Sequence, residues 1–332
     1  MNIYDIAKLA NVSISTVSRV INNPEVVKPE TRAHVLKIMS KHSYIPNAMA
    51  RGLVYKSMKI IGLMMNDLMH QHFQIIAAEL EKMFFGWNYT TLVSNIGDDD
   101  TEKFEKYLRT FAGQKVDGLV VIGSFLNDTE VENLLKIYMP TTPVIVSSYS
   151  NIKLPSVCSV QVDHYFGMQL CIRYLISKGH KDIGFVYCRD SNNTKRKIEA
   201  FLRVLRENKL KINREQNTII TTSGSQGGFE LAEKYRSEKP PYSVFVCTDD
   251  AIAVGALNGF KSQGLSVPND IAIVGYDNTE LALCSDPSLT TIDPKAENQA
   301  IVMANTMHDL LDNKTVGNSI SIRPEFVIRE ST

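Results

Sequence analysis

The sequence is poor in the features that mark secreted and membrane proteins. It contains no run of about 18 apolar residues, the length that a membrane-spanning helix requires. Tyr4 and Asp5 interrupt the place where the apolar part of a secretion signal would lie. We therefore expect a protein of the cytosol. The 332 residues include only five cysteines, none spaced as CxxC, which we expect to be reduced and buried: Cys158, Cys171, Cys188, Cys247 and Cys284.

Motifs of several common enzyme classes are also missing. No GxxxxGK[ST] or GxSxG motif occurs, and the glycines within 224–228 lack the spacing of a phosphate-binding loop. His70 and His72 could suggest a metal, but no clear third ligand accompanies them. Asp249 and Asp277 could be imagined as an acid and a base, although hydrogen bonding to hydroxyl groups is the simpler explanation. We expect no catalytic residues, no metal and no cofactor.

The formal net charge of zero hides an uneven distribution of charge. Up to Ser57 the chain has eight basic and three acidic side chains, so this part carries +5 and the remainder carries −5. A basic head on an acidic body is expected where only the head meets phosphate groups. Ordinary solvated surface charge can also produce such a segment.

The first twenty residues show apolar side chains at helical spacing on both sides of a short break. These are Ile3, Ile6, Ala7 and Ala10 before the break, and Val17, Val20 and Ile21 after it. Val12 can fill the corner between two helices, and Ser13 can cap the second one. The pattern predicts a helix-turn-helix. Residues off the apolar stripe of the second helix suit base edges and phosphates: Ile14, Ser15, Thr16, Ser18 and Arg19.

A third helix is expected to begin at Pro29, whose missing N–H is harmless at a first helical position. Its apolar residues can complete a three-helix core with Ile6 and Val17: Val35, Leu36 and Met39. Asn47 can then cap a short helix that would be unstable alone in water. The residues leave open whether this segment is a plain linker or becomes ordered on a partner.

From Lys59 onward, apolar runs of strand length alternate with amphipathic helical segments. The expected strands are Ile60–Met65, Thr91–Val93, Gly118–Ile122, Val144–Ser147, Ile183–Tyr187, Ser243–Cys247 and Ile271–Gly275. The expected helices lie near Phe73–Phe85, Glu102–Phe111, Glu130–Tyr138, Phe166–Ser177, Arg196–Glu207, Phe229–Tyr235, Ala251–Gln263 and Glu297–Leu311. This alternation is typical of an α/β fold with doubly wound parallel sheets. So many strands predict two sheets with a cleft between them, the first sheet ending near Cys158–Val162.

Ligands of such sheets bind at the carboxyl ends of the strands. The polar and aromatic residues there are Asn66, Asp67, His70, His72, Phe73, Ser147, Ser148, Tyr149, Arg189, Asp190, Asn193, Lys197, Thr248, Asp249, Asp250, Tyr276, Asp277 and Asn278. Such a mixture suits a polyhydroxylated or heteroaromatic small molecule. Each could also be an ordinary cap or turn residue, and we expect Asp250 to cap the helix at Ala251.

These residues resemble the lactose-repressor (LacI) family of bacterial transcription regulators over essentially the whole chain. The most specific segments are IYDIAKLANVSISTVSRVIN, TRAHVLKIMSKHSYIPNAMARGL, VFVCTDDAIAVGAL and VPNDIAIVGYDN. The resemblance implies a homodimer on a palindromic operator, with headpiece helices in the major groove and paired hinge helices in the minor groove. It also implies a body like the periplasmic sugar-binding proteins, with a small effector in its cleft.

Carried over by position, Ile14, Ser15 and Arg19 fall where the family reads bases, and Thr16 and Ser18 fall where it meets the backbone. Arginine can bridge O6 and N7 of guanine, whereas Ile14 offers only apolar contact. Leu53 matches the hinge leucine that wedges between base pairs, and Asn47 and Ala50 match its neighbours.

We expect the effector site at nine of the strand-end positions: Asp67, His70, Phe73, Ser147, Tyr149, Asn193, Lys197, Asp249 and Asp277. Among them, Asp249 and Asp277 match positions at which the family contacts its ligands. Lys197 stands where many sugar-responsive members have arginine, and a lysine cannot clamp two oxygens as a guanidinium does. We expect a sugar, a sugar phosphate or a related polyol, acting as inducer or co-repressor. The catabolite control branch answers instead to a phosphorylated carrier protein, but the arginine it uses falls here at about Asn305.

The resemblance divides the chain into a headpiece at 1–46, a hinge at 47–58 and a body at 59–332. Within the body we expect one subdomain at about 59–158 plus 290–320, and another at about 159–289 plus 321–332. We expect a ligand-controlled repressor, most simply of a carbohydrate operon, that shifts between two arrangements of its halves. A regulator switched by a protein, and a sugar-binding transport protein without a DNA role, are the alternatives.

Overall fold

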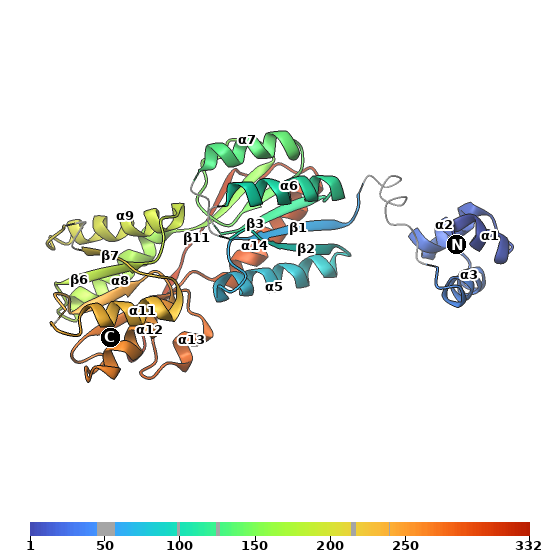
Figure 1. Ribbon diagram of the computed structural model, residues 1–332. Coiled ribbons are helices and arrows are strands. Elements are labelled where there is room, and N and C mark those ends of the chain that lie inside the picture. The colour runs from blue at the N-terminus through green and yellow to red at the C-terminus, as the bar shows by residue number, and fades with distance from the viewer. Residues whose placement is uncertain (45–56, 98–99, 124–126, 214–216, 239) are drawn as a thin grey trace. The chain divides into compact units, whose positions relative to one another are not determined.

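The computed structural model describes residues 1–44, 57–97, 100–123, 127–213, 217–238 and 240–332. The chain forms two compact units, Met1–Lys59 and Ile60–Thr332 (Figure 1). Within the described ranges, no helix combines the length and the apolar character needed to cross a membrane.

The first unit is a small all-helical headpiece. Its elements are α1 (Ile3–Leu9), α2 (Ile14–Asn22), the short 3-10 helix η1 (Pro24–Val26) and α3 (Pro29–Lys41). The Ser13 hydroxyl accepts the backbone N–H of Thr16 at 3.1 Å and so caps α2, as the sequence predicted. Asn2 caps α1 in the same manner, and the Asp5 carboxylate accepts the backbone N–H of Asn2.

The headpiece core forms where the three helices meet. Ile6, Val17 and Val35 are fully buried, and Met39 is nearly so. The prediction that Leu36 joins this core was wrong, because 47% of its surface is exposed. Leu36 directly follows Val35 on α3, and a step of one residue on a helix turns the side chain about 100° away from the buried face.

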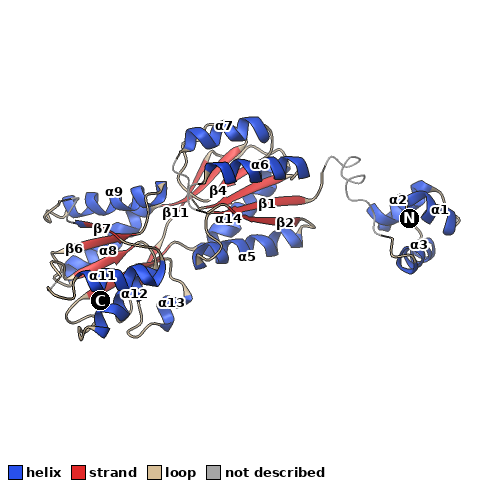
Figure 2. Cartoon of the chain, in the orientation of Figure 1, coloured by secondary structure: helices blue, strands red, loops and turns tan. Residues whose placement is uncertain are grey.

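The second unit contains two six-stranded sheets (Figure 2). The first sheet has the strand order β11-β5-β4-β3-β1-β2, and its strand pairs are parallel. Its strands are β1 (Ile60–Met65), β2 (Thr90–Asn95), β3 (Gly118–Ile122), β4 (Val144–Val146), β5 (Val157–Val162) and β11 (Ser319–Ile322). Helices α5 (Gln71–Gly86) and α14 (Ala296–Leu311) share one core with the sheet, and α6 (Thr101–Gln114) and α7 (Asp128–Tyr138) share another. We call this the first lobe.

The second sheet has the order β12-β10-β9-β8-β6-β7, and only its edge pair β10–β12 is antiparallel among the pairs described. Its strands are β6 (Ile183–Tyr187), β7 (Thr218–Ile220), β8 (Val244–Cys247), β9 (Ala272–Tyr276), β10 (Thr290–Asp293) and β12 (Glu325–Val327). One core contains α8 (His164–Ser177) and α9 (Asn192–Glu207), and the other contains α11 (Gly224–Lys234), α12 (Asp250–Ser262) and α13 (Glu280–Cys284). We call this the second lobe. The expected α/β fold with two parallel sheets is thus confirmed.

The chain passes between the lobes after β5, between β10 and α14, and between β11 and β12. The first passage comes after Val162 rather than at 158/159, because β5 continues to Val162 and pairs with β4 and β11. Likewise, β10 pairs with β9 in the second sheet, so residues 290–293 lie in the second lobe. Strand β11 keeps residues up to Ile322 in the first lobe.

The cysteines differ partly from the expectation of buried packing. Cys158, Cys171 and Cys247 are buried and free, whereas Cys188 is half-buried and Cys284 is exposed. Cys284 ends the short helix α13, where only Ala282 is buried.

Candidate functional site

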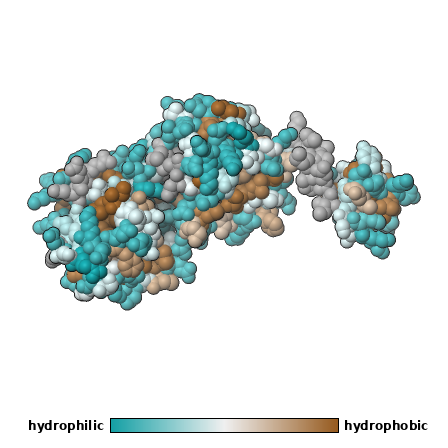
Figure 3. Space-filling view, in the orientation of Figure 1, coloured by the Kyte–Doolittle hydropathy of each residue, from teal (hydrophilic) through white to brown (hydrophobic). Residues whose placement is uncertain are grey.

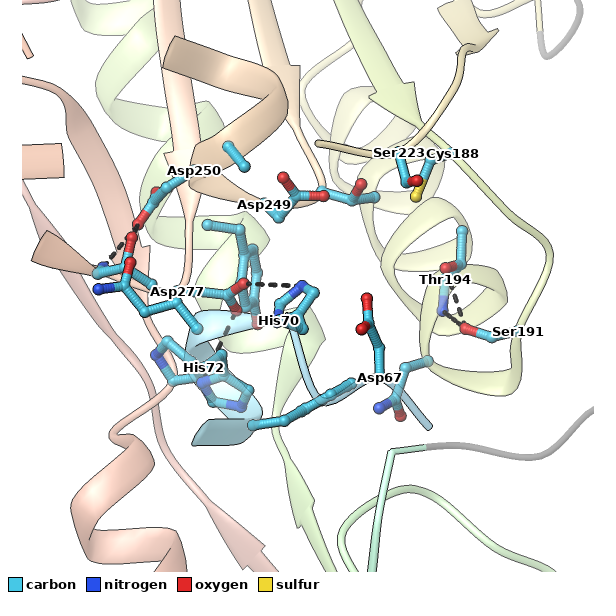
Figure 4. Close-up of a pocket in the computed structure, with 18 of the residues that line it drawn as sticks. Asp67, His70, His72, Cys188, Ser191, Thr194, Ser223, Asp249, Asp250 and Asp277 are labelled. Carbon is cyan, nitrogen blue, oxygen red and sulfur yellow. Dashed lines mark hydrogen bonds and ion pairs between the residues drawn. The ribbon is translucent and has the colours of Figure 1, made fainter. Parts of the chain in front are cut away.

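A cavity of about 430 Å³ lies between the two lobes at the carboxyl ends of their strands (Figure 4). The topology creates it, because loops that follow parallel strands gather at one edge of each sheet. Eight of the nine positions expected for an effector line it: Asp67, His70, Phe73, Ser147, Asn193, Lys197, Asp249 and Asp277.

The first lobe contributes the loop between β1 and α5. The Asp67 carboxylate accepts the backbone N–H of Met69 at 2.8 Å, and Gln74 donates to the Leu68 carbonyl at 2.8 Å. His70 stacks on Phe73 with ring centroids 4.6 Å apart. These contacts fix the loop, so that the side chains of His70 and Phe73 are held at the cavity wall.

Asp277 is the central carboxylate of the second lobe, and it directly follows β9. Its φ of +108° lies in the left-handed region, which costs a residue with a side chain about 1–3 kcal/mol. Neighbouring bonds compensate, since Asn278 donates to Asp293 at 3.2 Å and accepts from Arg329 at 2.6 Å. Burial raises the pKa of Asp277 well above its usual range, while the Lys197 ammonium opposes that rise.

Lys197 extends from α9 into the cavity and is 9% exposed. Its Nζ donates to the Thr248 carbonyl at 2.9 Å and lies 3.5 Å from the centre of the Tyr276 ring. Burial lowers the pKa of the Lys197 ammonium, and Asp277 and Asp249 oppose this. The Lys197 ammonium is therefore a compact positive charge near Asp277, and it cannot bind two oxygens side by side as a planar guanidinium group does.

The roles of Asp249 and Asp250 differ from those that we expected from the sequence. The Asp249 carboxylate caps α12 by accepting the N–H of Ile252 at 2.8 Å. Asp250, 1% exposed, accepts the backbone N–H of Thr279 at 2.7 Å and the hydroxyls of Thr279 and Thr291 at 2.9 and 2.6 Å. The expectation that Asp250 caps the helix was therefore wrong. Its actual role is to tie the loop after β9 to α12, which positions Asp277.

Three histidines line the cavity, and burial disfavours the charged form of each. Desolvation lowers the pKa of His70, lowers that of His72 well below its usual range, and lowers that of His164 to about 3. His164 also pairs through Nδ1 with the Tyr276 hydroxyl at 2.7 Å. We did not expect His164 in the site from the sequence, although its place directly after the strand that ends at Val162 was an available signal.

Two more of the expected residues form the side walls. Ser147 accepts the backbone N–H of Gly123 through Oγ at 2.9 Å, which turns its hydroxyl hydrogen toward other partners. Asn193, at the start of α9, hydrogen-bonds His164. Arg189 also lines the cavity, and burial lowers its pKa.

Tyr149 does not line this cavity. Arg196 stacks over its ring at 3.8 Å, and the Tyr149 hydroxyl donates to Asn151 at 2.8 Å. These contacts place Tyr149 in a separate hollow of about 280 Å³, on which Val162 and His164 also border. The prediction failed because position after a strand does not decide toward which side a ring turns.

The headpiece presents the expected reading residues on the outer side of α2. Ile14 is 41% exposed, Ser15 and Arg19 are exposed, and Thr16 and Ser18 are half-buried. The hydroxyl of Ser13 lies 2.8 Å from those of Ser15 and Thr16, which orients the start of the helix. The hinge residues Asn47, Ala50 and Leu53 lie outside the described residues.

Across the described ranges, no group of three or more His, Cys, Asp or Glu side chains could hold a metal ion.

Comparison with known proteins places both units among bacterial regulators. Residues 2–47 match the family described as bacterial regulatory proteins, lacI family, and residues 172–332 match a periplasmic binding protein-like domain. The chain is 32% identical to catabolite control protein A of Priestia megaterium, over 100% of this chain and 99% of that protein. It is 33% identical to the HTH-type transcriptional repressor PurR of Klebsiella pneumoniae, over 99% and 96% of the two chains. The fold is similar to that of the lac repressor dimer bound to operator and the anti-inducer ONPF, with a TM-score of 0.89, 24% identity and coverage of 100% and 98%.

Proposed function

This chain belongs to the LacI family of bacterial regulatory proteins, and on that basis we propose that it represses a carbohydrate-utilisation operon under the control of a small effector. The family consists of regulators rather than enzymes. One observation carries the proposal: a cavity bounded by both lobes belongs to the same chain as a helix-turn-helix headpiece. A ligand that contacts both lobes can favour one arrangement of the lobes over another.

The headpiece reads DNA through α2 in this proposal. Arg19, Ile14 and Ser15 contact base edges, and Thr16 and Ser18 contact the backbone, since they lie on the outer side of a capped helix. Asn47, Ala50 and Leu53 act in the hinge, with Leu53 as the wedge between central base pairs. The operator is a palindrome with a deformable centre.

The effector is a neutral sugar or polyol rather than a sugar phosphate. Within the described lining, four carboxylates face two cationic side chains: Asp67, Asp249, Asp250 and Asp277 against Arg189 and Lys197. A phosphate dianion would therefore face more carboxyl groups than cationic partners in a desolvated site. Hydroxyl groups, in contrast, donate to carboxylates and accept from Lys197.

The partner subunit is a second copy of this chain. Phe85 on α5 is 72% exposed and Val93 on β2 is 52% exposed, and apolar side chains gather over these two elements (Figure 3). An exposed apolar surface on one face of a lobe is typical of a subunit interface. A dimer would present two headpieces to the two halves of a palindrome. Because its target is operator DNA, the protein works in the cytoplasm.

The test uses the palindromic duplex that the purified protein selects from random DNA. Arg19→Ala should cost about 1–3 kcal/mol of affinity for this duplex, since it removes a forked donor from base edges. Fluorescence anisotropy at fixed salt measures the dissociation constant, with Arg32→Ala on α3 as the matched control. A protein that selects no duplex, or equal losses for both variants on selected and unrelated DNA, would contradict the proposal.

A further inference from the structure

Asp277 faces two histidines from the opposite lobe. His70 Nε2 lies 3.8 Å from Oδ2 of Asp277, and His72 Nδ1 lies 4.0 Å from Oδ1. Each imidazole thus faces a different oxygen of one carboxylate (Figure 4). We infer that this arrangement reads a vicinal diol, two hydroxyl groups on neighbouring carbon atoms of the effector, and that His72 is a residue that determines specificity. The inference rests on the proposed function, in which the effector is polyhydroxylated.

The distances suit one bridging oxygen at each position. A direct N–H···O bond needs a separation of about 2.7–3.2 Å, so neither histidine bonds Asp277 directly. Two hydrogen bonds of ordinary length add up to more than 4.0 Å, so a single oxygen placed to one side of the N···O line reaches both atoms. Two such oxygens, one for each carboxylate oxygen, correspond to the two hydroxyls of a vicinal diol.

The donors and acceptors also match. A carboxylate oxygen accepts hydrogen bonds, and a neutral imidazole donates through its one N–H. A hydroxyl group does both, so each hydroxyl of the diol can donate to Asp277 and accept from a histidine. An ether oxygen or a missing hydroxyl at either position would leave the carboxylate oxygen without a donor.

The free protein leaves polar atoms of this region without partners. Among the described side chains, Nδ1 of His70, Nδ1 of His72 and Oγ1 of Thr248 are buried and make no hydrogen bond. The His72 side chain is only 10% exposed and lines the cavity. Buried polar atoms in folded proteins almost always have a partner, which can be a bound molecule. The orphaned nitrogen of His72 therefore marks a place for a ligand group.

The diol would also join the lobes. His70 and His72 come from the loop and helix that follow β1, whereas Asp277 follows β9 of the second sheet. A ligand oxygen held between these side chains is bonded to both lobes at once. Such a ligand prefers the arrangement in which the two sides are close, and this differential affinity is what a population shift requires.

The experiment compares His72→Phe with His72→Asn. Phenylalanine keeps a planar ring but removes both nitrogens, while the amide nitrogen of asparagine can occupy the place of Nδ1. The probes are aldohexoses, aldopentoses and hexitols, each with its monodeoxy counterparts, examined first by thermal shift on the wild type and then by calorimetry. For the polyol that binds best, the two monodeoxy counterparts that lack either hydroxyl of one neighbouring pair should each bind about tenfold or more weakly. The affinity of His72→Phe for that polyol should be at least about tenfold lower than that of the wild type, and this variant should discriminate poorly against the deoxy compounds. His72→Asn should retain most of the affinity and most of the discrimination.

The substitution His34→Phe, on the exposed surface of α3, serves as the control and should leave binding unchanged. If no polyol raises the melting temperature of the wild type, the proposed effector class fails and this inference fails with it. If a polyol binds but His72→Phe binds it equally well, or if no two monodeoxy counterparts altered at neighbouring carbon atoms bind more weakly, the inference alone is overturned. Should His72→Phe not fold, the wild-type deoxy series and His72→Asn still decide.

Discussion

The burial of one residue, His164, makes the stability of the folded protein depend on pH. Its pKa falls to about 3 because the buried imidazole loses its solvation, and the Lys197 ammonium adds to this effect. The unfolded chain, with a pKa near the usual value of about 6.5, therefore binds more protons than the folded chain between pH 6.5 and 3. The stability linked to His164 is fully present above pH 6.5 and is lost as the pH falls toward 3.

We predict that His164→Asn flattens this dependence. The amide can still pair with the Tyr276 hydroxyl but does not titrate, so the free energy of unfolding should fall less steeply below pH 6.5. The difference in slope should approach about 1.4 kcal/mol per pH unit for one proton. Urea denaturation at a series of pH values measures it, and titrations common to both proteins cancel in the comparison. If the free energy of unfolding depends on pH in the same way in wild type and variant, His164 is not the source of this dependence. The substitution His34→Asn, at an exposed position, supplies the control.

Residue positions along the sequence predicted most of the cavity but not the direction of each side chain. Asp67, Lys197 and Asp277 could be placed there because strand ends gather at one edge of a parallel sheet. Tyr149 was misplaced, because its stacking with Arg196 depends on a helix that is distant in the sequence. The role of Asp250 has the same origin, since its partner Thr279 directly precedes α13 and its partner Thr291 lies in β10, and only the folded chain brings them near.

At the scale of elements, local patterns predicted the long helices and the central strands. Ile60–Met65 and Gly118–Ile122 agree with the expected ranges, because a buried parallel strand is a continuous apolar run. The short edge strands β7 and β12 have no such run and could not be recognised. Strand β10 belongs to the second sheet because it pairs with β9. The spacing of apolar residues along the sequence does not show which strands pair.

The hinge is the element for which we predict the sharpest mutational effect. Leu53→Ala should lower affinity for the selected palindrome while leaving affinity for unrelated DNA nearly unchanged. An apolar wedge offsets a few kcal/mol of unstacking through the contacts that a kinked duplex permits, and unrelated DNA gains no such contacts. Anisotropy titrations on both duplexes provide the measurement. Equal losses on the two DNAs would exclude the wedge, and Leu36→Ala, an exposed leucine of the headpiece, tests for a general effect of truncation.

At the scale of the whole molecule, we propose that the lobes and the headpiece take part in one linked equilibrium. The cavity takes walls from both lobes, and the chain passes between them at three described places. An effector can shift such an equilibrium only by its differential affinity for the two states. Whether it releases or recruits DNA therefore depends on which arrangement of the lobes it stabilises.

We propose that occupancy of the cavity between the lobes controls occupancy of the operator. The most direct measurement is the dissociation constant for the selected palindrome, with and without a saturating polyol that raises the melting temperature of the protein. We predict a change of about 5- to 150-fold in the wild type, and little change in Asp277→Asn, which lacks the central carboxylate of the cavity. An operator affinity that does not respond to a bound polyol, or that responds equally in Asp277→Asn, would contradict it.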